Sequence, residues 1–313
     1  MIFFYLTFGP NLEVHRQAVF SAMTILGAPR PEVSIIVLTD APEYYRFLGD
    51  RVTVRVTSAA ELRDWRGPHD FFWRIKIKAL EDLARRHPEE HLVYLDADTF
   101  CFGSLPRMRA LLDGGTHLMH AREGTLAELP TRTERRMWQQ CENRSFGGLT
   151  VDGASTMYNA GVVGLSAGGA ARAVEIALRI CDDMCAAGVI RRLIEQFALS
   201  VALASAGRLA AANFCIGHYW GNKEGWNTYT ADFFLEHHLR ATSLDEQLAA
   251  AGRVDFGVLP IYGKSSRTRD KLVRWVNAVL GKNIYAFVPD TEGEVSDLSE
   301  RRLARKGETS PRP

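Results

Sequence analysis

The strongest constraint on the fold is the alternation of strand and helix patterns through the first hundred residues. Short apolar runs typical of buried strands cover Ile2–Thr7, Val33–Asp40 and the segment "LVYL". Helical spacing covers Glu13–Leu26 and Phe71–His87. Strands that alternate with helices form parallel sheets with helices on both faces. The chain is therefore predicted to be an α/β protein with a mostly parallel central sheet.

The pattern is less regular further along the chain. Strands are predicted at "THLMHARE" and "TMYNAGVVGL", and helices at Ala170–Ala187 and Arg191–Ala206. The polar segment Arg122–Asp152 shows no period and predicts a long irregular connection, of the kind that is often functional. The stretch "CIGHYWGNKEGW" predicts a loop rich in aromatic residues and glycine.

The composition of the 313 residues excludes several classes of protein. A hydrophobic share of 46% and a charged share of 24% are ordinary for a globular protein. The net charge of +1 provides no general attraction for nucleic acid, so no nucleic-acid partner is predicted. Five cysteines without a C-x-x-C pair favour a reducing compartment. With no apolar run of about 20 residues and no basic leader, the prediction is a cytoplasmic protein.

The segment "VYLDADTF" places two carboxylates at the end of a predicted buried strand. Ligands of open parallel sheets bind at the carboxyl ends of the strands. Asp96 and Asp98 are two residues apart, so on extended backbone both side chains point to the same side. Two close anions need a cation, and a divalent metal bound by carboxylates and substrate phosphates provides one. The plain alternative is that Asp98 caps a turn and Asp96 is solvated.

A phosphatase of the haloacid dehalogenase type also begins with D-x-D after a strand. That family has Thr or Val two residues after the second Asp, where this chain has Phe100, with Thr99 one position early. The motif of that family also lies close to the start of the chain, whereas here it lies near residue 100. Both features count against a phosphatase.

Four motifs in a fixed order resemble GT-A glycosyltransferases of the glycosyltransferase family 8 type, which includes glycogenin-like and galactosyltransferase-like enzymes. The segment "YLDADTF" resembles the metal-binding D-x-D, and "YNAGVVGL" resembles the F-N-x-G strand. The segment "IEQFAL" resembles the D-Q helix start, and "HYWGNKEGW" resembles the H-F-x-G-x-x-K-P-W loop. The resemblance covers about residues 1 to 230. It implies a GT-A fold and a retaining transfer of sugar from a nucleotide-sugar, in such families a UDP-sugar, to a saccharide.

The same resemblance implies a metal site. Asp96, Asp98 and His218 would bind Mn²⁺ or Mg²⁺, and an imidazole among oxygen ligands suits Mn²⁺ somewhat better. Gly221 would let the backbone approach the phosphates, and Lys223 would add a positive charge. The family has its Lys six residues after the His, whereas Lys223 is five after and Glu224 occupies the family position.

Further residues are implied to bind the nucleotide or to act at the reacting sugar. The nucleotide group lies at strand ends and in the helix before the metal strand: Thr7, Phe8, Asp40, Arg74, Lys78 and, between the two aspartates, Ala97. The catalytic group is Asn159, Glu195 and Gln196, where Glu replaces the Asp of the family. Four aromatic residues of the last motif are candidates for a wall beside a sugar ring, or else for packing: Tyr219, Trp220, Trp226 and Tyr229.

The predicted division is a GT-A catalytic domain over residues 1–252, followed by a C-terminal helix and disordered tail over 253–313. A nucleotide-sugar half covers about residues 1–100 and an acceptor half about 101–252. Lys264–Lys282 combines basic residues with an apolar helical face that includes Trp275. This pattern predicts either peripheral contact with the inner face of a membrane or packing on the catalytic domain.

Two other function classes remain open at this stage. A nucleotidyltransferase that makes nucleotide-sugars has a Gly-rich loop with Arg and Lys after its first strand, whereas "TFGPNLEVHR" has a single Gly and no Lys. A non-catalytic paralogue that binds nucleotide-sugars is favoured by the displaced Lys223.

Overall fold

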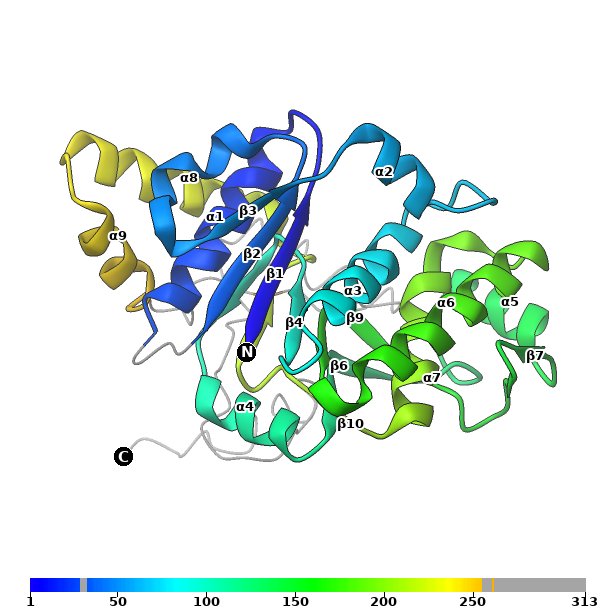
Figure 1. Ribbon diagram of the computed structural model, residues 1–313. Coiled ribbons are helices and arrows are strands. Elements are labelled where there is room, and N and C mark those ends of the chain that lie inside the picture. Colours follow the sequence, from blue (N-terminus) through cyan, green and yellow to red (C-terminus); the bar gives the residue numbers. More distant parts are fainter. Residues whose placement is uncertain (29–32, 255–260, 262–313) are drawn as a thin grey trace, which may run out of the picture.

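The computed structural model describes residues 1–28, 33–254 and 261 (Figure 1). Its centre is a seven-stranded sheet in the order β10-β6-β9-β4-β1-β2-β3. The strands are β1 Ile2–Thr7, β2 Ser34–Thr39, β3 Thr53–Val56, β4 Leu92–Leu95, β6 Thr116–Thr125, β9 Thr156–Leu165 and β10 Arg208–Ala211. Only β9 runs against its neighbours, so the prediction of a mostly parallel sheet is confirmed.

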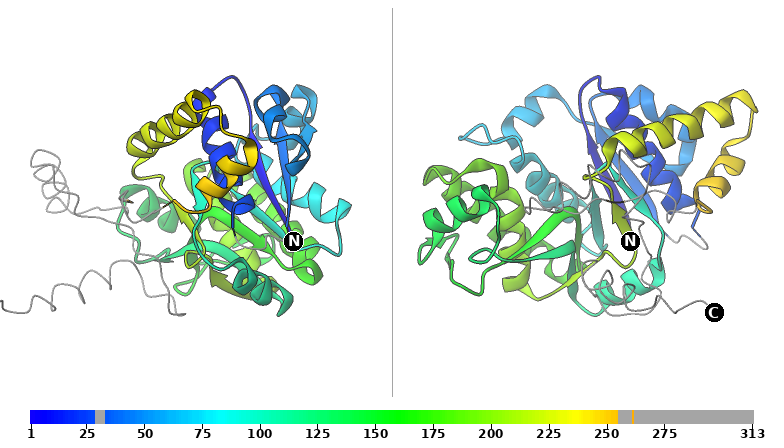
Figure 2. Two further views of the ribbon diagram at one scale, coloured as in Figure 1. Left: turned by 90° about the vertical axis from the view of Figure 1, so that its left-hand side faces the viewer. Right: turned by 180° about the vertical axis from the view of Figure 1, so that it is seen from behind.

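Helices cover both faces of this sheet because its strands are apolar on both sides. In β1, Phe3 and Tyr5 point to one face and Ile2 and Phe4 to the other, and all four are buried. The helices are α1 Leu12–Leu26, α2 Ala59–Trp65, α3 Arg74–Arg86, α4 Leu105–Asp113, α5 Arg132–Cys141, α6 Ala170–Ala186, α7 Ile194–Ala206, α8 Lys223–Leu239 and α9 Leu244–Ala251. Helices α3, α6 and α7 pack on the face of Phe4, while α1, α4 and α9 pack on the face of Phe3 (Figure 2).

A second, two-stranded sheet joins distant parts of the sequence. The strand β5, Thr99–Cys101, pairs antiparallel with β11, Ile216–His218, so that His218 lies opposite Thr99. A third sheet pairs β7, Ser145–Phe146, with β8, Leu149–Thr150. The β5–β11 pairing brings a histidine beside the two aspartates that follow β4.

Two of the sequence predictions were wrong in detail. The segment Arg122–Asp152 is not irregular, because it contains α5. Thr131 and Glu134 form a capping box at the N-terminus of this helix. The predicted loop "CIGHYWGNKEGW" contains β11 and the first residues of α8. The strand β11 is very short and the helix α5 is polar in sequence, so the hydrophobic period of each is weak. Tertiary packing fixes both elements instead.

The predicted basic helix over Lys264–Lys282, the tail and most of the segment after residue 252 lie outside the described residues. The domain division at residue 252 and membrane contact through that helix therefore stay predictions. In the part of the chain that the structure describes, no helix has the length and apolarity needed to cross a bilayer. All five cysteines are buried thiols, including Cys181 and Cys185 on α6.

Candidate functional site

Two carboxylates and an imidazole converge where β4 ends. The ligand atoms of Asp96, Asp98 and His218 all lie within 4.8 Å of one another. The Nε2 atom of His218 is 3.3 Å from Oδ1 of Asp98 and 3.8 Å from Oδ2 of Asp96. Asp98 and His218 are buried, whereas Asp96 is partly exposed toward a pocket. Two carboxylates and one imidazole form a donor set that suits a divalent cation such as Mn²⁺.

The contacts of His218 fix which ring nitrogen faces the carboxylates. Its Nδ1 atom lies 3.0 Å from Oδ1 of Asn159, and that oxygen also accepts the backbone N–H of Gly161 at 3.0 Å. Since this oxygen is an acceptor, Nδ1 donates to it, and Nε2 is the ring nitrogen that faces Asp96 and Asp98. The ring fits only because residue 161 is glycine, since a Cβ there would lie 2.2 Å from Nδ1. Nε2 is thus the ring nitrogen placed to contact a cation held between these carboxylates.

Lys223 lies beside the same group despite its displaced position in the sequence. Its Nζ atom is 2.8 Å from Oδ2 of Asp98. Burial alone would raise the pKa of Asp98, but His218 and Lys223 together hold that pKa well below its usual range. Asp98 is therefore a carboxylate at neutral pH, and a half-exposed cation stands next to it.

A buried lysine that the sequence analysis missed links two carboxylates in the same region. Lys76 places Nζ 3.3 Å from Oδ1 of Asp96 and 3.0 Å from Oε1 of Glu195, and donates to the carbonyl of Ala160 at 3.0 Å. Burial lowers the pKa of Lys76, yet the two carboxylates outweigh it and the pKa is raised. The pKa of Glu195 is raised, chiefly by burial, with Lys76 opposing. Buried isoleucines at 75 and 77 mark this turn of α3 as a buried one.

The structure does not bring Arg74 and Lys78 into this group. Arg74 forms a two-pronged ion pair with Asp182 on α6, with Nε and Nη2 at 2.7 and 2.9 Å from its oxygens. Lys78 pairs with Glu81 on its own helix. Their assignment to the nucleotide stays a prediction that this geometry does not favour, and Lys76 lies where such a cation was expected.

Asn159 and Gln196 are held by one carboxylate that the sequence analysis also missed. Glu123 on β6 accepts from Nε2 of Gln196 at 2.9 Å and from Nδ2 of Asn159 at 3.4 Å. It thereby orients both carboxamides, and through Asn159 it supports the orientation of His218. The sequence gives no local sign of this role, because β6 and β9 meet only in the folded sheet.

The remaining predicted nucleotide-binding residues lie at the edge of the sheet near β1. Thr7 is buried and shares a 2.7 Å hydrogen bond with the hydroxyl of Tyr45, while Phe8 lines the pocket. Asp40 accepts the backbone N–H of Gly9 at 2.8 Å. Two others lie close in sequence to the candidate metal ligands: Ala97 between the aspartates, and Gly221 in the turn before α8.

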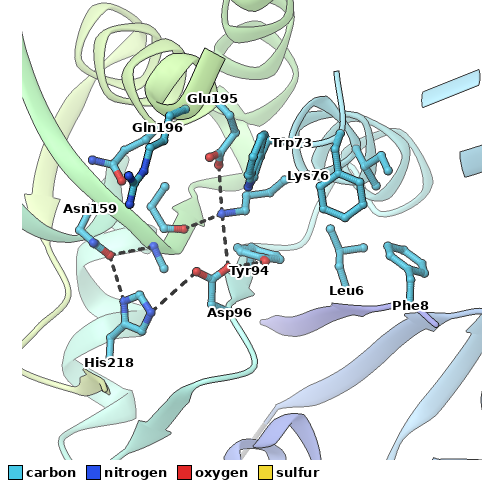
Figure 3. Close-up of a pocket in the computed structure, with 15 residues that line it drawn as sticks. Leu6, Phe8, Trp73, Lys76, Tyr94, Asp96, Asn159, Glu195, Gln196 and His218 are labelled. Carbon is cyan, nitrogen blue, oxygen red and sulfur yellow. Dashed lines mark hydrogen bonds and ion pairs between the residues drawn. The ribbon is translucent and has the colours of Figure 1, made fainter. Parts of the chain in front are cut away.

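The site opens into a pocket of about 310 Å³ (Figure 3). One part of its lining is polar: Lys76, Asp96, Asn159, Glu195, Gln196, Arg192 and His218. The other part is apolar: Leu6, Phe8, Phe72, Trp73 and Ile75. Such a division suits a ligand with an apolar ring at one end and polar groups at the other.

The predicted aromatic wall does not form as expected. Tyr219 and Trp226 have no exposed surface and stack on one another with ring centroids 4.7 Å apart. Trp226 also stacks on Phe100, again at 4.7 Å. Tyr229 packs against the same cluster, and neither it nor Trp220 lines the pocket. The alternative of core packing holds for this cluster.

No protein-family model matches the chain, and no curated protein sequence matches it either. Solved structures do match it. One is mouse xyloside xylosyltransferase 1 in its apo form, with 13% identity, a TM-score of 0.46, and coverage of 67% of this chain and 83% of that chain. Another is galactosyltransferase LgtC in complex with donor and acceptor sugar analogs, with 13% identity, a TM-score of 0.41, and coverage of 67% and 73%. Similarity this low does not by itself establish an activity.

Proposed function

We propose that this chain is a metal-dependent glycosyltransferase of the GT-A type. It would move a sugar from a nucleotide-sugar, a UDP-sugar in our proposal, to a saccharide or other glycan acceptor. The observation that carries the proposal is the group Asp96, Asp98 and His218 at the edge of a pocket. These residues come from two of the four motifs that resemble glycosyltransferase family 8, and His218 lies 120 residues after Asp98 in the chain.

The residues present fit a divalent cation, since Nε2 of His218 and the carboxylates of Asp96 and Asp98 face one another within 4.8 Å. Asp96, Asp98 and His218 would hold Mn²⁺ in preference to Mg²⁺ because of the imidazole. When bound, the cation would neutralise charge on the departing nucleoside diphosphate. Lys223 would supply a second positive charge at the same place.

The other side chains of the pocket would bind and orient the substrates. In this proposal Asn159 and Gln196 hydrogen-bond sugar hydroxyls, with Glu123 fixing their orientation. Lys76 opposes the rise of the Glu195 pKa that burial causes, and its ion pair holds Glu195 in place beside the reacting sugar. Leu6 and Phe8 form the apolar end that takes the base. Thr7 and Asp40 hold the turn after β1 rather than touching the base.

We also propose that the transfer retains the anomeric configuration. Support for retention comes from the resemblance of "YNAGVVGL" and "IEQFAL" to the retaining family, together with the position of Gln196 and Glu195 in the pocket. In this proposal the side-chain carbonyl oxygen of Gln196 stabilises an oxocarbenium-like centre. An NMR spectrum of the first-formed glycoside should show the donor's anomeric configuration, and an inverted centre would overturn this part.

Hydrolysis of UDP-sugars without an acceptor tests the proposed activity. Slow hydrolysis is expected with Mn²⁺ and should stop when a chelator is added, because water can replace the acceptor. Binding of UDP and Mn²⁺ in a thermal-shift assay, with no turnover of any donor, would favour the non-catalytic paralogue. Release of pyrophosphate from UTP and a sugar phosphate would favour a nucleotidyltransferase.

A further inference from the structure

Two large aromatic side chains are exposed where the pocket opens. Phe72 is 50% exposed and Trp73 is 46% exposed, and both line the pocket. Their ring centroids are 5.9 Å apart with an interplanar angle of 87°, so each presents a face in a different direction. Neighbouring exposed aromatic side chains beside a pocket favour ligand recognition.

Residues 66–73 carry these rings, and we call this segment the aromatic lip. Several contacts hold it in place. Phe71 is buried, with 1% of its surface exposed, and anchors the lip to the core. Arg74 donates from Nη1 to the carbonyl of Trp65 at 3.0 Å while its other nitrogens hold Asp182. Arg191 donates to the carbonyl of His69 at 2.8 Å. The exposed rings therefore sit on a preorganised support, which lowers the cost of ordering them around a ligand.

Trp73 of the aromatic lip belongs to the apolar part of the pocket lining, but it lies beside Lys76 and Glu195 of the polar part. Trp73 is the N-cap residue of α3, one turn before Lys76, and Lys76 reaches Glu195 at 3.0 Å. The contact of Arg191 with the lip also places the lip against the segment just before α7, where Arg192 lines the pocket. Figure 3 shows Trp73 beside Lys76 and Glu195, while Phe8 lies at the opposite side.

We propose that Trp73, with Phe72 and Arg192, forms the subsite for the acceptor and that the acceptor is a saccharide. This inference rests on the proposed function, which puts the donor sugar near Asn159 and Gln196. The apolar C–H face of a pyranose ring stacks on the indole of Trp73, and the guanidinium of Arg192 donates hydrogen bonds to ring hydroxyls. The subsite differs from the predicted aromatic wall at residues 219–229, which is buried.

Saturation-transfer NMR on the whole chain tests saccharide binding independently of any activity. The probes are the methyl glycosides of glucose, galactose, xylose, mannose and N-acetylglucosamine. At least one should receive saturation from the wild type, and Trp73→Ala should weaken its binding about tenfold, as expected for loss of one aromatic stack. Trp73→Phe should recover part of the signal.

The matched control is Phe47→Ala, because Phe47 is 48% exposed but packs near Phe234, away from the pocket. It should bind the glycosides as the wild type does. Absence of binding by the wild type, or undiminished binding by Trp73→Ala, would overturn the acceptor subsite.

A kinetic measurement separates this inference from the proposed function. With a donor that the wild type hydrolyses, the ratio of transfer to hydrolysis should fall about tenfold in Trp73→Ala and stay unchanged in Phe47→Ala. A fall in donor affinity with an unchanged ratio would assign Trp73 to the nucleotide and overturn the acceptor role. If the wild type turns over no donor, the proposed function fails, and the NMR result alone decides whether the lip binds saccharides.

Discussion

Two groups of aromatic residues on the same protein have opposite surroundings. Phe100, Tyr219 and Trp226 have no exposed surface, whereas Phe72 and Trp73 are about half exposed. The buried group, which we call the aromatic cluster, includes Phe100 of β5 and packs on the β5–β11 sheet that carries His218. The exposed pair lines the pocket. The comparison shows that a high aromatic content does not tell whether the rings are exposed to a ligand or buried in the core.

The aromatic cluster packs beside a short strand pair, since β5 and β11 have three residues each. The backbone N–H of Tyr219 donates to the carbonyl of Asp98 at 3.0 Å, which ties the end of β11 to the second aspartate. A Cβ on Gly217 would lie 2.2 Å from the ring of Phe100, so glycine lets that ring lie on the strand. Glycines and aromatics in "IGHYWGNKEGW" thus serve packing around the site.

The largest expected effect concerns the free energy of unfolding. Trp226→Ala should lower it by about 3–5 kcal/mol, because it removes a fully buried ring from the centre of the aromatic cluster. Trp73→Ala, at a half-exposed ring, should change it by no more than about 0.5 kcal/mol. Urea unfolding followed by circular dichroism measures both, and equal losses would abolish the distinction between the two groups.

The next largest effect concerns the proposed metal site beside the aromatic cluster. Asp98→Asn should lower the affinity for UDP with Mn²⁺ by about 100-fold or more, since loss of outer-shell partners alone costs 10- to 100-fold. Calorimetry with and without Mn²⁺ gives the value. Asp50→Asn is the control, because the side chain of Asp50 is fully exposed. An unchanged affinity in Asp98→Asn would remove Asp98 from the metal site.

A smaller effect tests whether the affinity for Mn²⁺ depends on the close packing of His218 against Gly161. Gly161→Ala would place a Cβ 2.2 Å from the Nδ1 atom of His218 and force the ring to turn. The affinity for Mn²⁺, measured by electron paramagnetic resonance, should fall about 10- to 100-fold. Gly168→Ala is the control, since a Cβ there meets no atom within 4 Å. Equal affinities for the two variants would mean that His218 is not a ligand.

The smallest effect concerns a residue two contacts away from the metal site. Glu123→Gln replaces one acceptor oxygen with a donor and should let the carboxamide of Asn159 turn over, so that His218 loses its single tautomer. The Mn²⁺ affinity should fall about tenfold, and ¹⁵N NMR of the imidazole should show both tautomers. Glu128→Gln, at an exposed glutamate, should behave as the wild type. A wild-type tautomer in Glu123→Gln would limit Glu123 to a packing role.

Much of the fold could be predicted because the pattern that determines it is local. The strand and helix periods of residues 1–100 locate β1, β2, α1, α3 and β4 within a few residues. The two aspartates also follow from position, since the carboxyl end of a parallel strand is where ligands bind. His218 needed the family resemblance, because only the pairing of β5 with β11 brings it to Asp98.

The positions of other charged residues in the site depend on ion-pair partners that the local sequence pattern does not predict. Helical period groups Arg74 with Lys78, one turn apart, but Asp182 and Glu81 pair with them, while Lys76 between them is the lysine that reaches Asp96. A charge finds its partner by distance in the folded chain. Asp182 and Asp96, the partners of Arg74 and Lys76, lie outside α3, whereas Glu81 lies on α3 with Lys78.

By itself, the sequence determined the alternation of strands and helices, the place of Asp96 and Asp98, and the resemblance that adds His218. The tertiary structure alone decided which aromatic rings are buried, which lysine enters the site, and that Glu123 orients Asn159 and Gln196. The physical reason is the range of the interactions. Periodicity and strand ends follow from backbone geometry over a few residues, whereas burial and hydrogen-bond partners are set by packing between segments far apart in the chain.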